Sequence, residues 1–250
     1  MRITLINPNI TTSMTDMIDA AAKRVAAPDT EITTITSSIG PDALETKFDE
    51  FIAIPGVLKE VLRIEKEKSA DAIIVACYGD PGLQAAKEIA SIPVIGIAQA
   101  SMYFAALVAA KFSIVTDLSS GVEGIEELVR NYGMERLCVS VRATEVPVLG
   151  FEEDHNEGLK ALEEHSLLAM KNDGAEAICL ACAGLVGFTE EMQKDLGIPV
   201  FDGVIAAVKL AEGLVSMGKT TSKYCTYKTP PVKKAAGMAA EWMDMLAQCK

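Results

Sequence analysis

Short apolar runs alternate with longer segments of helical periodicity along most of the chain. Continuous apolar or β-branched runs predict strands buried on both faces, whereas apolar positions three or four residues apart predict helices. Alternation of the two patterns predicts parallel sheets joined by helical crossovers, which is an α/β fold. The expected strands cover residues 2–6, 31–36, 72–76, 94–97, 112–115, 137–141, 177–181 and 200–201.

Local signals predict where several helices begin and end. One helix is expected to start near Thr11, and helical stretches are expected through residues 44–69, interrupted at Pro55-Gly56. After the strand at 72–76, we expect Asp80 to cap the next helix, with Pro81 as its first residue. From about residue 206 the chain is again predicted to be helical.

The chain also contains an internal repeat. Residues 71–99 align with residues 176–205, because each segment contains an acidic-Ala-Ile start, an apolar strand, Ala-Cys-x-Gly, a helix and Ile-Pro-Val. The strands that precede them, within residues 3–7 and 113–117, occupy matching places. We therefore predict two similar α/β lobes that share a cleft. The first lobe comprises residues 1–97 and 206–250, and the second comprises residues 98–205.

Two cysteines follow buried strands at equivalent points of this repeat. Cys77 and Cys182 lie 105 residues apart, and ligands of open parallel sheets bind beyond the carboxyl ends of the strands. A small-residue turn and an expected helix follow each cysteine, and a helix N-terminus binds anions and lowers the pKa of a nearby thiol. Most free cysteines are simply small core residues, but the repeated placement favours a symmetric acid–base pair.

Other polar groups are expected at the same strand ends. Asn7 and Asn9 flank Pro8 after the first strand, where their amides either bind a ligand or order the turn. Thr116-Asp117 occupies the matching place in the second lobe. The candidate binding residues are Asn7, Asn9, Tyr78, Gly79, Thr116, Asp117, Ala183 and Gly184.

The motifs of metal and nucleotide sites are missing from the sequence. Cys179 and Cys182 form a C-x-x-C, but a spacing of three on a strand places the two sulfurs on opposite faces. His155 and His165 fit no familiar ligand spacing. No G-x-G-x-x-G or G-x-x-x-x-G-K occurs. We therefore expect no metal and no cofactor.

Composition narrows the class of protein. The 250 residues include 35 acidic and 23 basic side chains, and the net charge of −12 argues against nucleic-acid binding. The start of the chain becomes polar too soon for a signal peptide, and the longest apolar runs are far below the ~20 residues of a membrane span. Six cysteines are too few for a disulfide scaffold. We expect a cytoplasmic protein with free thiols that contacts no membrane and forms a homo-oligomer.

Several of these segments resemble the hydantoin and allantoin racemases of the aspartate/glutamate racemase superfamily. They are INPNITTSM at the first strand, ACYGDPG around Cys77, VIGIA at 94–98, FSIVT before Asp117, LACAGL around Cys182 and PVFDGVIAAVKLAE at 199–212. The resemblance implies two Rossmann-like lobes with the active site between them. It also implies racemisation without a cofactor, with Cys77 and Cys182 on opposite faces of the stereocentre.

The residues after each cysteine bear on the substrate. Relatives that act on free aspartate or glutamate usually have Asn-Thr or Thr-His there, whereas this chain has Tyr78-Gly79 and Ala183-Gly184. Backbone donors and an aromatic wall favour a neutral cyclic ureide, either a 5-substituted hydantoin or allantoin. An aspartate or glutamate racemase, a maleate isomerase and a two-lobed small-ligand sensor remain the alternatives. The segment 38–50 resembles the family's substrate-side loop, although Thr46-Lys47 departs from the Gly-His common there.

Overall fold

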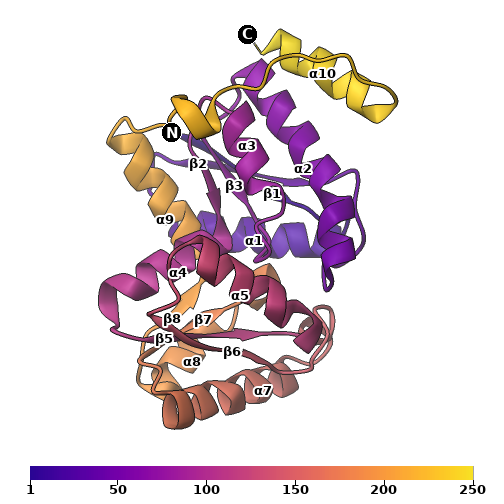
Figure 1. Ribbon diagram of the computed structural model, residues 1–250. Helices are drawn as coiled ribbons and strands as arrows, with labels where there is room; N and C mark the ends of the chain where they lie inside the picture. The colour runs from indigo at the N-terminus through magenta and orange to yellow at the C-terminus, as the bar shows by residue number, and fades with distance from the viewer. Residues whose placement is uncertain (250) are drawn as a thin grey trace.

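Two parallel β-sheets form the framework of the computed structural model, which describes residues 1–249 (Figure 1). Their strand orders are β2-β1-β3-β4 and β6-β5-β7-β8. The strands are β1 (Arg2–Asn7), β2 (Glu31–Thr36), β3 (Ala72–Val75), β4 (Val94–Gly96), β5 (Phe112–Thr116), β6 (Cys138–Ala143), β7 (Ala177–Leu180) and β8 (Val200–Asp202). The predicted α/β fold with two parallel-sheet lobes is confirmed, and every expected strand is present.

Helices connect the strands and cover both sheets. The α-helices are α1 (Thr12–Val25), α2 (Lys47–Glu67), α3 (Leu83–Ile89), α4 (Ile97–Val108), α5 (Val122–Asn131), α6 (Gly150–Glu153), α7 (His155–Leu168), α8 (Thr189–Leu196), α9 (Gly203–Ser216) and α10 (Met238–Gln248). Four short helical turns complete the set: η1 (Ser119–Gly121), η2 (Ala169–Asp173), η3 (Ala183–Leu185) and η4 (Cys225–Tyr227).

The internal repeat corresponds to a repeat in structure. In each sheet the first strand of the lobe pairs with the second and third, so β1 and β5 occupy the same topological position. All four residues of β3 and of β7 are buried, as their continuous apolar sequences predict. Because all strands of a sheet run in the same direction, the turns after β1 and β3 meet at one edge. The turns after β5 and β7 meet at the equivalent edge of the second sheet.

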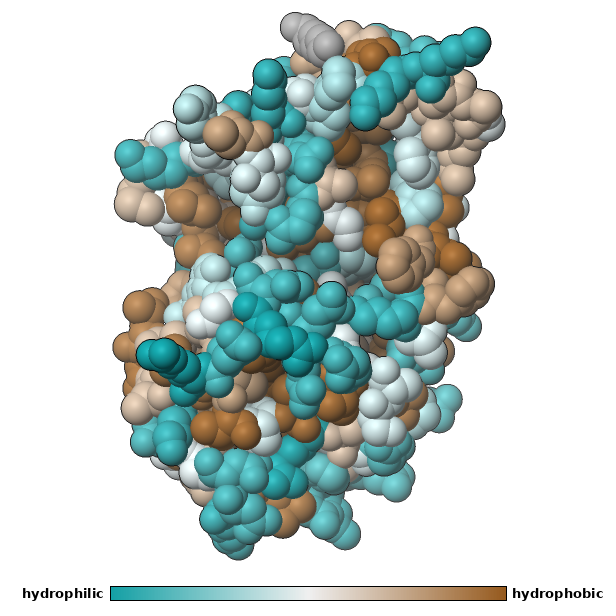
Figure 2. All heavy atoms as spheres, in the orientation of Figure 1, coloured by the Kyte–Doolittle hydropathy of each residue, from teal (hydrophilic) through white to brown (hydrophobic). Residues whose placement is uncertain are grey.

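One apolar core joins the two lobes. It contains Ile74 of the first sheet and Ile114 and Cys179 of the second, together with helices α4 and α9. Two further cores lie within single lobes, one beneath α2 and one beneath α7. Burial of apolar side chains between the lobes stabilises their contact. In the space-filling view the lobes meet along a waist (Figure 2).

The end of the chain returns to the first sheet. Helix α9 packs on α1 and α4, and α10 packs on α2 (Figure 1). Helix α9 also contacts both β3 and β8, so the division of the lobes at residues 97 and 206 stays a prediction. Between residues 1 and 249, no helix has both the length and the apolar character needed to cross a membrane.

Two local predictions are wrong. Helix α2 continues through Pro55 without interruption, and Gly56 lets it pass close to the turn after β2, because a Cβ there would lie 2.0 Å from Ser37 Oγ. Helix α3 begins at Leu83 after Gly82 rather than at Pro81. Asp80 does not cap α3; its carboxylate accepts hydrogen bonds from the start of α4 instead.

Candidate active site

A pocket lies between the carboxyl ends of the two sheets and is lined by both lobes. Its lining includes eight of the ten candidate residues of the sequence: Asn9, Cys77, Tyr78, Gly79, Thr116, Asp117, Cys182 and Ala183. Asn7 and Gly184 are not among the lining residues. The pocket therefore brings together the turns after β1, β3, β5 and β7, which are far apart in the sequence.

Cys77 and Cys182 occupy matching places in this pocket. Each is half-buried, and each follows the last residue of a buried central strand by two positions. The N–H of Gly184 donates to Cys182 Sγ at 3.4 Å, and the N–H of Gly79 makes the equivalent bond to Cys77. A negative charge on Cys77 raises the pKa of Cys182, which puts the two sulfurs within electrostatic reach of one another.

Burial makes both thiols weaker acids. It raises the pKa of Cys77 to about 12, although the Gly79 N–H opposes this shift. Burial and the charge of Asp117 also raise the pKa of Cys182 well above its usual range, against the opposing bond from Gly184. The expected lowering of the thiol pKa by a helix N-terminus is therefore wrong in sign. The physical reason is that desolvation of the two thiols outweighs the backbone N–H donors beside them. Helices α3 and α8 begin six and seven residues beyond the cysteines, and only the three-residue turn η3 directly follows Cys182.

Asp117 is a buried carboxylate in the lining of this pocket. Burial raises its pKa to about 6. Its Oδ1 accepts hydrogen bonds from Thr116 Oγ1 at 3.0 Å and from the Leu118 N–H at 2.7 Å. The backbone N–H of Asp117 also donates to its own carboxylate, and the residue lines the pocket. Asp117 can therefore accept a hydrogen bond from a bound molecule.

The two asparagines after β1 have different positions. The amide of Asn7 is fully buried and donates to Asn9 Oδ1 at 2.8 Å and to Thr15 Oγ1 at 2.9 Å. Asn9 lines the pocket, and its Nδ2 contacts Met14 Sδ. Asn7 thus orders the turn and orients Asn9, while Asn9 is the one of the two that faces the pocket.

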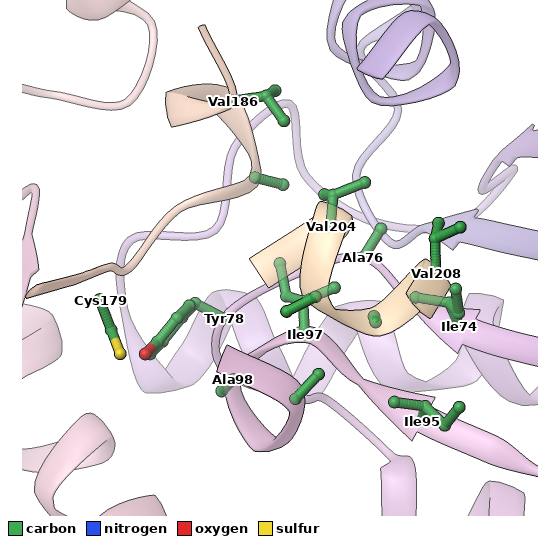
Figure 3. Close-up of a cluster of buried hydrophobic side chains, with 14 of the residues drawn as sticks. Ile74, Ala76, Tyr78, Ile95, Ile97, Ala98, Cys179, Val186, Val204 and Val208 are labelled. Carbon is green, nitrogen blue, oxygen red and sulfur yellow. The ribbon is translucent and has the colours of Figure 1, made fainter. Parts of the chain in front are cut away.

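Tyr78 contributes to the pocket wall without a free hydroxyl. Its hydroxyl shares a 3.0 Å hydrogen bond with Ser101, and the ring points into the core between the lobes, towards Cys179 (Figure 3). Gly79 allows a close approach, because a Cβ there would lie 2.4 Å from Glu50 Oε1. The two cysteine turns thus present mainly backbone to the pocket.

A loop of the first lobe reaches across to the second. The Glu45 carboxylate accepts from the Val148 N–H at 3.1 Å, and the Glu45 carbonyl accepts from Ser120 Oγ at 2.9 Å. Lys47 pairs with Glu50 at 3.0 Å and with Glu127 of α5 at 3.6 Å. Residues 44–47 and Glu50 line the pocket as well. From the sequence, this segment is expected near the substrate only because residues 38–50 resemble the substrate-side loop of the family.

Several lining residues of the second lobe carry no sequence signal of a site. They are Ser120, Gly121, Gly124, Ile125 and Val148. The absence of a side chain at Gly124 leaves room for the Lys47 ammonium group, because a Cβ at position 124 would lie 2.8 Å from Lys47 Nζ. Because these residues face the pocket only when the lobes are assembled, periodicity along the chain could not identify them.

The charge of the pocket is negative. Its lining holds the carboxylates of Glu45, Glu50 and Asp117 against the single ammonium of Lys47. Lys47 is already paired with Glu50 and Glu127. In the described part of the chain, no group of three or more His, Cys, Asp or Glu side chains has the arrangement of a metal site.

Comparison with known proteins agrees with this architecture. A family model described as Asp/Glu/Hydantoin racemase matches residues 3–211. A hydantoin racemase from Pseudomonas sp. (strain NS671) is 45% identical over 237 residues, which are 95% of each chain. The structure of allantoin racemase from Klebsiella pneumoniae has a TM-score of 0.92 and 41% identity, covering 96% of this chain and 98% of its own. Allantoin racemase from Pseudomonas fluorescens also has a TM-score of 0.92, with 38% identity, over 95% of this chain and 100% of its own.

The fold, the pocket and these similarities define an isomerase of the racemase type. More narrowly, the chain belongs to the Asp/Glu/Hydantoin racemase family.

Proposed function

We propose that this protein racemises neutral five-membered cyclic ureides, either a 5-substituted hydantoin or allantoin, by proton transfer at C5 between Cys77 and Cys182. The observation that carries the proposal is the equivalent placement of the two thiols in one pocket. Similarity to hydantoin and allantoin racemases over almost the whole chain supports the same substrate class.

The chemistry needs one base and one acid on opposite faces of the ring. The C5 hydrogen lies beside a carbonyl, so its removal as a proton leaves an enolate. One cysteine takes this proton as a thiolate, and the other returns a proton to the far face as a thiol. No electrons are gained or lost, and no cofactor takes part.

Backbone donors next to the cysteines suit the enolate oxygen. Among the described residues, the N–H groups of Tyr78 and Ala183 have no hydrogen-bond acceptor. Each directly follows a cysteine, so the pair repeats the symmetry of the thiols. Preorganised N–H donors of this kind stabilise a developing oxyanion.

The charge of the pocket favours a neutral ring over a free amino acid. Binding a carboxylate away from water requires a cation or fixed donors to offset its desolvation. The one ammonium in the lining, Lys47, is already shared between two glutamates. The Asp117 carboxylate, which lines the pocket, instead offers an acceptor for a ring N–H. Aspartate, glutamate and maleate are therefore the less favoured substrates, and a ligand sensor would not require a paired thiol.

Circular dichroism with a small substrate panel tests the proposal. We expect kcat/KM for allantoin or a 5-alkyl hydantoin to exceed that for L-aspartate, L-glutamate and maleate by at least a hundredfold, because sites built on hydrogen bonds discriminate strongly. An amino acid or maleate that outperforms both ureides would overturn the substrate assignment. No turnover of any of the five compounds would favour the sensor.

We further propose a cytoplasmic location and a homo-oligomeric state. All six cysteines are free thiols, which suits a reducing compartment. Leu107 and Val108 at the end of α4 are 77% and 61% exposed and could pack against a second copy. Sedimentation at several protein concentrations tests the oligomeric state, and a monomer throughout would contradict it.

A further inference from the structure

The two lobes cap equivalent helices in different ways. In the second lobe, Asp202 at the end of β8 caps α9, and its Oδ1 accepts from the Ile205 N–H at 2.9 Å. In the first lobe, the equivalent residue at the end of β4 is Gly96, which has no side chain to cap α4. The first lobe therefore has no residue at the end of β4 that could cap α4 in the way that Asp202 caps α9.

Asp80 supplies this cap from another element. Its Oδ1 accepts from the Ala98 N–H at 3.2 Å, and its Oδ2 accepts from the Gln99 N–H at 3.1 Å. The absence of a side chain at Gly96 makes the arrangement possible, because a Cβ there would lie 2.1 Å from Asp80 Cγ. Asp80 also has a left-handed backbone, with φ of 45°, a conformation that Asp tolerates better than most residues.

The same carboxylate is joined to the second lobe. Tyr132, which follows α5, donates its hydroxyl to Asp80 Oδ2 at 2.6 Å. Burial and the charge of Asp80 raise the pKa of Tyr132, so this hydroxyl keeps its proton and remains the donor. Asp80 is itself buried, with a relative exposure of 5%. Three donors thus hold one buried carboxylate between α4 and α5.

Asp80 is also part of the turn that carries Cys77. Its N–H donates to the Cys77 carbonyl at 3.0 Å, and in the second lobe the Leu185 N–H makes the same bond to Cys182 at 3.2 Å. Leu185 is apolar and packs in the core of its own lobe. The two cysteine turns therefore share a backbone hydrogen bond, but only the turn of Cys77 is fixed by a carboxylate to other elements.

We propose that Asp80 is a positioning residue that fixes the Cys77 turn to the start of α4 and to Tyr132 of the second lobe, and so sets Cys77 against Cys182. Asp80 touches neither the substrate nor the reacting atoms. The inference rests on the proposed function for its effect on catalysis, whereas its effect on the mobility of the turn does not depend on it.

Variants at Asp80 and Gly96 can distinguish positioning of the Cys77 turn from simple capping of α4. Asp80→Gly removes the carboxylate, and glycine adopts the backbone of this turn without strain. The double variant Asp80→Gly/Gly96→Asp returns a cap to α4 at the position used by the second lobe, but leaves the Cys77 turn unattached. Asp202→Gly is the matched control, because it removes the cap of α9 and adds the same chain freedom at the equivalent strand end of the second sheet, outside the Cys77 turn.

Three measurements follow these variants: Tm, ureide racemisation and amide hydrogen exchange of residues 76–80. For Asp80→Gly we expect a lower Tm, faster exchange in this segment and at least a tenfold lower kcat. The double variant should recover Tm but not kcat or slow exchange. Asp202→Gly should lower Tm and leave exchange at 76–80 unchanged.

Two results would overturn the proposal. One is recovery of kcat to within twofold of wild type in the double variant, since Asp80 would then only cap α4. The other is equal loss of kcat and equal acceleration of exchange in Asp202→Gly, which would mean a global loss of stability. If the double variant does not recover Tm, the proposal is tested by comparing kcat and hydrogen exchange at residues 76–80 between Asp80→Gly and Asp202→Gly. If the wild-type protein racemises no ureide, the proposed function fails, and hydrogen exchange alone still tests the positioning of the turn.

Discussion

The hydrogen bond between Glu45 and Val148 allows a quantitative test of whether the loop at residues 44–47 holds the pocket closed over the substrate. The Val148 N–H donates to the Glu45 carboxylate at 3.1 Å, while both residues line the pocket. A hydrogen bond to a charged group contributes about 1.5–3 kcal/mol. Because Glu45 is only half-buried, we take the lower end of this range, about 1.5 kcal/mol, which is slightly more than tenfold in an equilibrium constant. Replacement of the Glu45 side chain leaves two other contacts of this loop with the second lobe intact. They are the hydrogen bond from Ser120 Oγ to the Glu45 carbonyl and the ion pair of Lys47 with Glu127.

Glu45→Ala should therefore raise KM for the preferred ureide about tenfold, since the loop closes less often over the substrate. Glu45→Gln keeps an oxygen acceptor for the Val148 N–H and should raise KM less than threefold, a loss of about 0.6 kcal/mol. The negative charge of Glu45 raises the pKa of Cys182, and both variants remove it. Both should therefore shift the rise of kcat/KM to lower pH by the same amount.

Steady-state kinetics by circular dichroism between pH 6 and 10 measures both effects. Equal increases in KM for Glu45→Ala and Glu45→Gln would refute the hydrogen-bond argument, because the oxygen acceptor would then be irrelevant. An unchanged KM in Glu45→Ala would refute closure by this contact altogether. Thermal unfolding of each variant serves as the control for a general loss of structure.

Two further predictions concern the thiols. Cys77→Ser and Cys182→Ser should each lower kcat at least a thousandfold with an unchanged far-ultraviolet spectrum, because a hydroxyl is a far weaker acid than a thiol; normal racemisation by both variants would exclude the two-base assignment. Since burial raises the pKa of Cys77 to about 12 and also raises that of Cys182, the thiolate fraction grows as pH rises. We expect kcat/KM to increase at least tenfold from pH 7 to 9, and a plateau below pH 7 would contradict the raised pKa values.

The order of elements could be predicted from the sequence because it depends on local patterns. Continuous apolar runs define β3 and β7, and the repeat of Ala-Cys-x-Gly after them places Cys77 and Cys182 at equivalent strand ends. The structure confirms the eight strands and brings both cysteines to one pocket. These features follow from residue type and spacing alone, since burial on two faces selects the same side chains in any parallel sheet.

Tertiary packing decided what those strand-end residues do. Asn7 and Asn9 look alike in the sequence, yet only Asn9 lines the pocket, while the Asn7 amide is used within the turn. Asp80 resembles a local helix cap, but its carboxylate acts on α4, because Gly96 leaves room for it there. The thiol pKa values also depend on assembly, since burial between the lobes outweighs the nearby N–H donors. Spacing along the chain encodes where a residue lies on its own element, whereas desolvation and long-range hydrogen bonds exist only once the two lobes have packed together.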